Sequence, residues 1–167
     1  RILSNKARIR PFAFGGTGFD TFSKTMPEDL PESLEAGTLN LPACLSMKEG
    51  ADYLSDNVNY VSNQLKNMTE YLISELSVRP YVKLYSIPNR SGIVAFSHND
   101  VSSQTLSEIL SERYDIATRG AFHCAPLMHR FLKTEKLGLV RVSLSPQNTR
   151  KEMNAFLFAL GEISQSV

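Results

Sequence analysis

The sequence predicts an α+β fold, in which helices cover one face of a small, largely antiparallel sheet of about four strands. Two stretches, residues 58–76 and 149–163, carry apolar side chains at three- and four-residue intervals, the spacing of a helix that buries one face. Between them lie short runs of β-branched and aromatic residues, separated by Pro, Gly, Asn and Asp. Because each helix has one apolar stripe to bury, this order of elements favours helices packed on one side of a sheet.

Composition and charge limit the class of protein. The 167 residues are 42% hydrophobic, which suffices for one buried core. Eighteen basic and seventeen acidic residues leave a net charge of +1 without a basic run, so we expect no nucleic-acid partner. No apolar stretch approaches the roughly 20 residues that span a bilayer, so we expect no membrane association. The two cysteines, Cys44 and Cys124, form no disulfide framework and favour a reducing, cytoplasmic setting.

The chain is expected to divide into a loop-rich arm, residues 1–40, and a domain, residues 41–167. The arm holds four of the nine glycines and three of the eight prolines, and its apolar residues follow no sustained period. A segment of this composition is not expected to fold alone. We therefore expect the arm to lie across another domain or subunit.

Two helices are predicted at the start of the domain. Asn40 and Pro42 are suited to the cap and first turn of a helix that ends at about Leu54. The cap-forming residues Ser55-Asp56-Asn57 then predict a second helix over residues 58–76, whose apolar stripe we assign to the core.

Four segments are predicted as strands, namely residues 81–85, 93–96, 114–118 and 139–143. A turn at residues 88–92 makes the first two a hairpin-like pair. Further helices follow the second and fourth strands. The first of these is capped within Asp100–Ser103, and the last begins at a capping box formed by Thr149 and Glu152.

The block Arg119-Gly120-Ala121-Phe122-His123-Cys124-Ala125-Pro126 holds the chain's most reactive combination of side chains. Gly120 and Pro126 predict a constrained loop around Cys124. A thiol reacts as the thiolate, which a nearby imidazole or guanidinium favours, and His123 and Arg119 are the local candidates. The alternative is a buried structural cysteine in a turn.

Arg141 lies in the middle of the fourth predicted strand. Alternation directs Val140 and Val142 to one face and Arg141 to the other. A guanidinium at a fixed strand position is suited to bidentate binding of a carboxylate, and the alternative is an exposed arginine on the open face of the sheet. We expect Arg141 and Cys124 to face one hollow.

The glycine-rich block Gly15-Gly16-Thr17-Gly18 can present backbone N–H groups and one hydroxyl to an anion. A metal site is not expected, because no zinc-type spacing connects the histidines and cysteines, which are His98, His123, His129, Cys44 and Cys124.

Four blocks, in this order, resemble the C-terminal part of the class V aminotransferase superfamily, in its cysteine desulfurase and selenocysteine lyase branch. They are Gly15–Gly18, Glu35–Asn40, Arg119–Pro126 and Leu139–Ser143. The resemblance extends from about Ile2 to Ile163. It implies the small C-terminal α+β domain of a fold type I pyridoxal phosphate (PLP) enzyme, preceded by the tail of the large domain.

The resemblance also implies an activity, in which sulfur passes from L-cysteine to Cys124 as a persulfide and alanine is released. Arg141 would bind the substrate carboxylate, with Arg119 and His123 beside it. Thr17, with Gly16, would bind the PLP phosphate of the neighbouring subunit, which implies a homodimer. A sulfur-acceptor protein would then take the persulfide.

One departure from the family pattern concerns the lysine that binds PLP. In the family this lysine lies shortly upstream of the glycine-rich block, and none of the eight lysines here stands in that pattern. The chain opens on Arg1, so we expect a fragment or processed product that does not turn over cysteine by itself.

Three alternatives to a cysteine desulfurase remain open. The first is a non-catalytic domain for dimerisation or for binding a sulfur acceptor. The second is a class V transaminase or lyase that acts on another amino acid. The third is a cysteine hydrolase, which is disfavoured because His123 is adjacent to Cys124 and is poorly placed to reach its sulfur.

Overall fold

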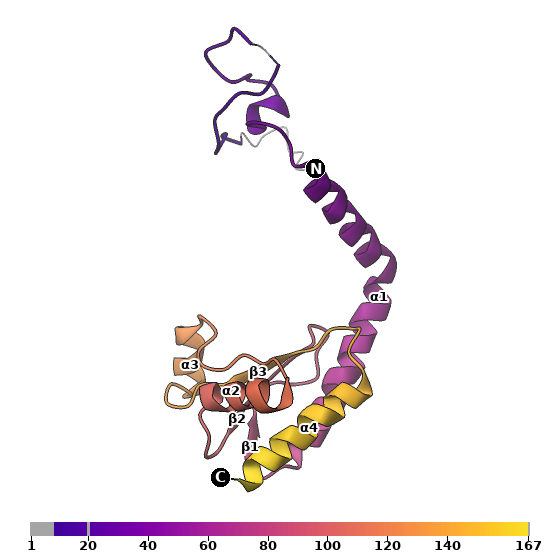
Figure 1. Ribbon diagram of the computed structural model, residues 1–167, viewed down its shortest axis with the longest axis vertical. Helices are drawn as coiled ribbons and strands as arrows, with labels where there is room; N and C mark the ends of the chain where they lie inside the picture. The colour runs from indigo at the N-terminus through magenta and orange to yellow at the C-terminus, as the bar shows by residue number, and fades with distance from the viewer. Residues whose placement is uncertain (1–8, 20, 167) are drawn as a thin grey trace. The chain divides into compact units, whose positions relative to one another are not determined.

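The computed structural model describes residues 9–19 and 21–166 (Figure 1). The first eight residues of the predicted arm, among them Lys6, lie outside the described residues, as do Asp20 and Val167. In the described ranges the elements are η1 (Glu32–Leu34), α1 (Leu41–Ser77), β1 (Val82–Leu84), β2 (Ile93–His98), α2 (Ser103–Tyr114), α3 (Pro126–Leu132), β3 (Val140–Ser143) and α4 (Arg150–Gln165). The chain divides into two compact units, Arg1–Asp56 and Asn57–Val167, and each is described by itself.

A single helix, α1, occupies the range for which two helices were predicted. Its bounds are Leu41 and Ser77, so the predicted break at Ser55–Asn57 is wrong. Ser, Asp and Asn favour caps, but in an exposed helical position each costs only a few tenths of a kcal/mol. Three capping residues therefore do not end a helix whose flanking sequence continues the helical pattern.

The sheet is antiparallel and has the order β1-β2-β3 in the described part of the chain. Val82 pairs with His98, and Val94 pairs with Val142. The antiparallel α+β prediction is confirmed, but the sheet has three strands, and the strand predicted at residues 114–118 is wrong. Asp115 instead adopts a left-handed conformation (φ 56°) that ends α2. Just after the predicted segment, Arg119 forms an isolated bridge to Arg141 of β3.

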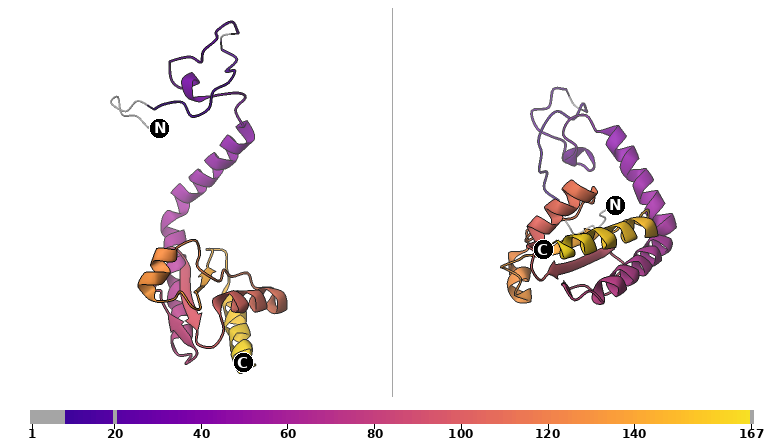
Figure 2. Two further views of the ribbon diagram at one scale, coloured as in Figure 1. Left: turned by 90° about the vertical axis from the view of Figure 1, so that its left-hand side faces the viewer. Right: turned by 60° about the horizontal axis from the view of Figure 1, so that its bottom comes forward.

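The core of the second unit lies between the sheet and three helices. Val94, Phe96 and Val140 supply the buried face of the sheet. Helices α1, α2 and α4 cover this face with side chains that include Leu72, Leu76, Leu106, Leu110, Phe156 and Leu160. Figure 2 shows α4 running beside the later part of α1 along the sheet. The apolar stripe of α1 is buried from Leu65 onward, whereas Val58 at its start is exposed.

Two predicted helix starts are confirmed by their capping hydrogen bonds. Ser102 caps α2, because its side chain accepts a hydrogen bond from the N–H of Thr105. Thr149 and Glu152 form the predicted capping box at the start of α4. Helix α3 was not predicted, because Pro126 was assigned to a loop end, whereas it occupies the first turn of this helix.

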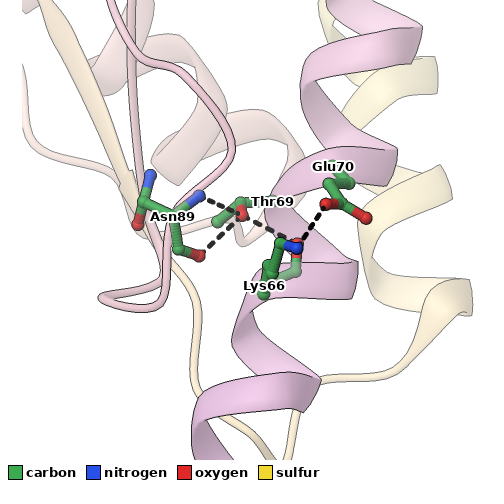
Figure 3. A network of polar contacts seen from close by, with 4 residues as sticks. All are labelled: Lys66, Thr69, Glu70 and Asn89. Carbon is green, nitrogen blue, oxygen red and sulfur yellow. Dashed lines mark hydrogen bonds and ion pairs between the residues drawn. The ribbon is translucent and has the colours of Figure 1, made fainter.

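A buried threonine fastens the turn after β1 to α1. Figure 3 shows Thr69, whose Oγ1 lies 2.9 Å from the carbonyl oxygens of Lys66 and Asn89. The same oxygen accepts a hydrogen bond of 3.0 Å from the N–H of Asn89. An ion pair between Lys66 and Glu70, at 3.4 Å, lies on the exposed side of the helix. Thr69 thus fixes the loop that leads into β2.

The described part of the first unit consists of loops, η1 and the beginning of α1. Its two glycine-containing blocks are joined by a hydrogen bond of 2.8 Å from the N–H of Gly37 to the carbonyl of Gly16. Among the described residues, no helix combines the length and apolar character that a bilayer crossing requires.

Candidate functional site

Cys124 lies at the end of a short turn between the bridge at Arg119 and helix α3. Three residues of this turn are left-handed, with φ values of 66° at Ala121, 50° at His123 and 57° at Cys124. Residues with a Cβ rarely adopt this conformation, because the Cβ crowds the following carbonyl. The Cys124 side chain is exposed and free, so the predicted loop is confirmed and the alternative of a buried cysteine is wrong.

The side chain of Arg119 reaches the thiol. Its Nη2 lies 3.8 Å from Cys124 Sγ, within the range of a hydrogen bond to sulfur. The guanidinium is therefore in direct contact with the sulfur. The structure thereby brings together Arg119 and Cys124, both of which the sequence singled out.

His123 is turned toward the backbone of the same loop. Its Nε2 lies 2.9 Å from the carbonyl oxygen of Arg119, which can only accept, so Nε2 carries the proton and Nδ1 the lone pair. Burial lowers the pKa of His123, the bond to Arg119 opposes this, and the charges of Arg141, His129 and Arg119 lower the pKa further. The imidazole is therefore neutral at pH 7 and available as a proton acceptor.

Arg141 pairs with Arg119 through the backbone. The N–H of Arg119 donates to the carbonyl of Arg141 at 3.1 Å, and the N–H of Arg141 donates back at 2.8 Å. Residues directly opposed in an antiparallel pair project their side chains to the same face. The Nε of Arg141 is buried and has no hydrogen-bond partner among the described residues. It is a buried donor that lacks an acceptor in the described part of the chain.

A buried histidine supports the turn, and the sequence assigned it no role. His129 is 3% exposed, and its Nδ1 lies 2.8 Å from Thr134 Oγ1. Its ring packs edge-on against the rings of Phe122 and His123, with centroid distances of 5.3 and 5.8 Å. The five-residue spacing of His129 and Thr134 matches no helical or strand period, so only the coordinates identify this pair.

The glycine-rich block lies in the first unit. Gly16 and Thr17 line a hollow of about 640 Å³ together with Glu35 and Thr38. A Cβ built on Gly16 meets no atom within 4 Å, so the backbone there is open to a ligand. The side chain of Thr17 is half-buried, and its Oγ1 accepts a hydrogen bond of 3.3 Å from the N–H of Phe19. Among the described residues, no three His, Cys, Asp or Glu side chains are grouped to hold a metal.

Comparison with known proteins identifies the class to which this fold and this turn belong. Residues 3–156 match the family described as Aminotransferase class-V, and the chain is a member of that family.

The more specific similarity is to cysteine desulfurases. The chain is 31% identical over 154 residues to a probable cysteine desulfurase of Methanothermobacter thermautotrophicus, and 29% identical over 158 residues to a cysteine desulfurase of Escherichia coli. These alignments cover 90% and 92% of this chain. The chain spans 38% of the length of each of these curated relatives.

Solved structures agree on the fold. The cysteine desulfurase CsdA of Escherichia coli has a TM-score of 0.79 at 24% identity, over 95% of this chain and 39% of its own. The apo cysteine desulfurase of Thermococcus onnurineus has a TM-score of 0.72 at 24% identity, over 94% of this chain and 40% of its own. A C-DES mutant with glycine covalently linked to its PLP cofactor has a TM-score of 0.67 at 16% identity, over 91% of this chain and 38% of its own.

Proposed function

We propose that this chain is the C-terminal part of a PLP-dependent cysteine desulfurase, and that Cys124 is its sulfur acceptor. The observation that carries the proposal is the contact between Arg119 Nη2 and Cys124 Sγ, on a turn tied by a backbone bridge to Arg141. An exposed thiol beside one guanidinium, with a second on the same face of the sheet, combines a nucleophile with a group for binding an amino-acid carboxylate.

In the proposed sulfur step, the thiolate of Cys124 attacks the sulfur of L-cysteine. A bond forms between the two sulfurs as the bond from sulfur to the substrate Cβ breaks. The electron pair of the broken bond stays with the carbon, which takes up a proton and becomes the methyl group of alanine. Bound PLP supplies the electron sink for this cleavage. The exposure of Cys124 then lets a sulfur-acceptor protein take the persulfide.

The substrate is held, on this proposal, by the carboxylate. Arg141 has a buried Nε without a partner among the described residues, and a carboxylate oxygen satisfies such a donor. Arg119 lies on the same face and approaches the reacting sulfur. His123 is neutral at pH 7, and its bond to the carbonyl of Arg119 supports the loop that carries the thiol.

The first unit is consistent with a role in holding the cofactor's phosphate. The open backbone at Gly16 and the hydroxyl of Thr17 both line one hollow, and such groups bind phosphate oxygens. We propose that they serve the PLP of the neighbouring subunit in a homodimer. On this proposal residues 1–40 are the tail of a large domain, residues 41–167 are the small domain, and the protein works in the reducing cytoplasm.

The test is the formation of a persulfide in the intact protein that contains this chain. With PLP and L-cysteine we expect alanine, and a mass increase of one sulfur on the peptide with Cys124. Cys124→Ser should abolish both, while Cys44→Ser should leave both unchanged. Alanine without a sulfur adduct on Cys124 would refute the acceptor role, and transamination of another amino acid would favour a different class V activity.

The 167-residue chain by itself provides the complementary test. None of its lysines stands in the family's pattern for binding PLP, so we expect no borohydride-trapped PLP adduct that a single lysine substitution removes. Such an adduct would contradict this part of the proposal. If the intact protein produces no alanine but binds a sulfur acceptor through this chain, a non-catalytic interaction domain is the better assignment.

A further inference from the structure

Ser103 has a buried hydroxyl group that does not cap its own helix, α2. It is the first residue of α2 and is 1% exposed, but the capping side chain is that of Ser102. Ser103 Oγ donates a hydrogen bond of 2.7 Å to the carbonyl of Leu137 and accepts one of 2.9 Å from the N–H of Ala121. Both partners are distant in sequence, so this side chain connects loops and does not stabilise a helix end.

The two partners belong to the two halves of the candidate site. Ala121 opens the turn that ends at Cys124, and Leu137 lies just before the strand that carries Arg141. The two segments also bond directly, because the N–H of Leu139 donates to the carbonyl of Ala121 at 3.2 Å. Ser103 therefore stands at a junction that sets the place of the thiol turn relative to the arginine strand.

Two glycines allow the backbone to close around this serine. A Cβ on Gly120 would lie 2.3 Å from the carbonyl oxygen of Ser103, and a Cβ on Gly138 would lie 2.5 Å from Ser103 Oγ. Neither distance is possible for a real side chain. Gly138 also has φ +64°, a conformation that glycine adopts without strain. The glycines on both sides thus permit the close approach in which Ser103 makes its two side-chain hydrogen bonds.

The turn needs such an external support. Three of its non-glycine residues are left-handed, a strained conformation that persists only where the surroundings hold it. The hydrogen bond from His123 to Arg119 joins two residues of the same loop, so it does not connect the turn to the core. The bond from Ala121 to Ser103 ties the turn to a helix of the core.

We propose that Ser103 is the positioning residue that holds the Cys124 turn against the Arg141 strand, and so fixes where the acceptor sulfur lies. Its consequence for sulfur transfer rests on the proposed function. The structural statement is testable without any turnover.

The experiment compares Ser103→Ala with Ser102→Ala in the full chain. Ser102→Ala is the matched control. It removes the cap of the same helix at the adjacent residue, and the Ser102 side chain bonds to Thr105 and not to the turn. Two readouts are local: hydrogen exchange at the amide of Ala121, and the NMR titration of the His123 ring. In Ser103→Ala we expect exchange at Ala121 to accelerate by at least about tenfold, the effect of one lost buried hydrogen bond. The titration midpoint of His123 should rise, because a released ring loses the burial that lowers its pKa.

Ser102→Ala should lower the melting temperature and leave both local readouts unchanged. A fall in melting temperature with unchanged local readouts in Ser103→Ala, or equal changes in both variants, would overturn the proposal. If Ser103→Ala does not fold, Ser103→Cys replaces it, because a thiol keeps a weak donor and acceptor at similar volume. It should move both readouts in the same direction by less, and no movement again overturns the proposal.

Sulfur transfer separates this proposal from the proposed function. If the intact protein forms the Cys124 persulfide, Ser103→Ala should lower its rate by about tenfold or more, whereas Ser102→Ala should not. If the intact protein forms no persulfide, the function is wrong and the exchange and titration results still decide the role of Ser103.

Discussion

Arg119 and Arg141 exchange both of their backbone hydrogen bonds across an isolated bridge, which directs two guanidinium groups to one face of the sheet. Arg119 then contacts Cys124 Sγ, and Arg141 keeps a buried Nε without a partner among the described residues. The two arginines are thus backbone neighbours whose side chains differ, since one contacts the sulfur and the other keeps an unpaired donor among the described residues. Replacing each arginine is therefore expected to affect a different measurement.

Replacing Arg141 by Ala is expected to weaken binding of L-cysteine by the intact protein. Loss of charge-assisted hydrogen bonds to a carboxylate corresponds to about 10- to 150-fold in KM. Arg141→Lys should not restore binding, since an ammonium lacks the planar fork. Steady-state kinetics checks this, with Arg90→Ala, an exposed turn position, as the control. An unchanged KM in Arg141→Ala would exclude the carboxylate role.

Replacing Arg119 by Gln is expected to slow alkylation of Cys124 by iodoacetamide at pH 7, by about threefold to tenfold. The reason is that the guanidinium contacts the sulfur at 3.8 Å and stabilises the negative charge on the attacking atom. The reaction is followed by mass spectrometry in a Cys44→Ser background, so that a single thiol reacts. Arg130→Gln removes the same charge from the exposed side of α3 and should have little effect. Equal rates for the parent chain and the Arg119 variant would contradict the contact.

Acid is expected to destabilise the second unit through His98. Its Nδ1 accepts hydrogen bonds from the N–H groups of Asp100 and Val101, and its Nε2–H donates to Ser164 Oγ at 2.9 Å. A proton on Nδ1 would face two donors. Burial lowers the pKa of His98 below its ordinary value of 6.5, and the charge of Asp100 opposes this in part. The unfolded chain therefore takes up the proton at higher pH than the folded chain.

The sign follows from this difference in proton binding. The stability due to neutral His98 is complete above pH 6.5 and is lost as the pH falls below that value. Urea unfolding at pH 7.5, 6.5 and 5.5 should show this decline. His98→Phe should unfold more easily at pH 7.5 but with a weaker dependence on pH. The pH dependence of stability that remains in His98→Phe is expected to disappear when His123→Gln is added, because the pKa of His123 is also lowered. A variant slope equal to that of the parent chain would rule out His98.

Replacing Thr69 by Val is expected to lower the free energy of unfolding by about 1 to 3 kcal/mol, because the N–H of Asn89 loses its buried acceptor. Valine has nearly the same shape, so little of the loss comes from packing. Urea unfolding measures it. Ser74→Ala removes an exposed hydroxyl that bonds only to the preceding turn of the helix, and it should change stability by less than about 0.5 kcal/mol.

Local signals in the sequence predicted those parts of the fold that depend on neighbours along the chain. The caps at Ser102 and Thr149 are confirmed because a cap is formed by residues three apart. The break at Ser55–Asn57 is wrong for a related reason, since the same residue types are tolerated inside an exposed helix. The strand predicted at residues 114–118 is wrong because Asp115 ends α2 in a left-handed conformation, which alternation alone does not reveal.

The candidate site was predictable where residue chemistry suffices and not where long-range bonds decide. Arg119, His123, Cys124 and Arg141 stand out by type and spacing, and the structure gathers them in one region of the second unit. Ser103 and His129 gave no signal, because their importance lies in partners far along the chain or buried beneath the turn. A serine after a cap and a histidine in a short helix are common in any sequence.

The left-handed backbone at Cys124 has a consequence for protein engineering. Glycine is the residue that this conformation favours, so Cys124→Gly should yield a sturdier molecule that has lost its chemistry. Selection for heat tolerance alone would drive this position away from cysteine. If Cys124 is the sulfur acceptor, as proposed, the cysteine at this position gives up stability in exchange for reactivity.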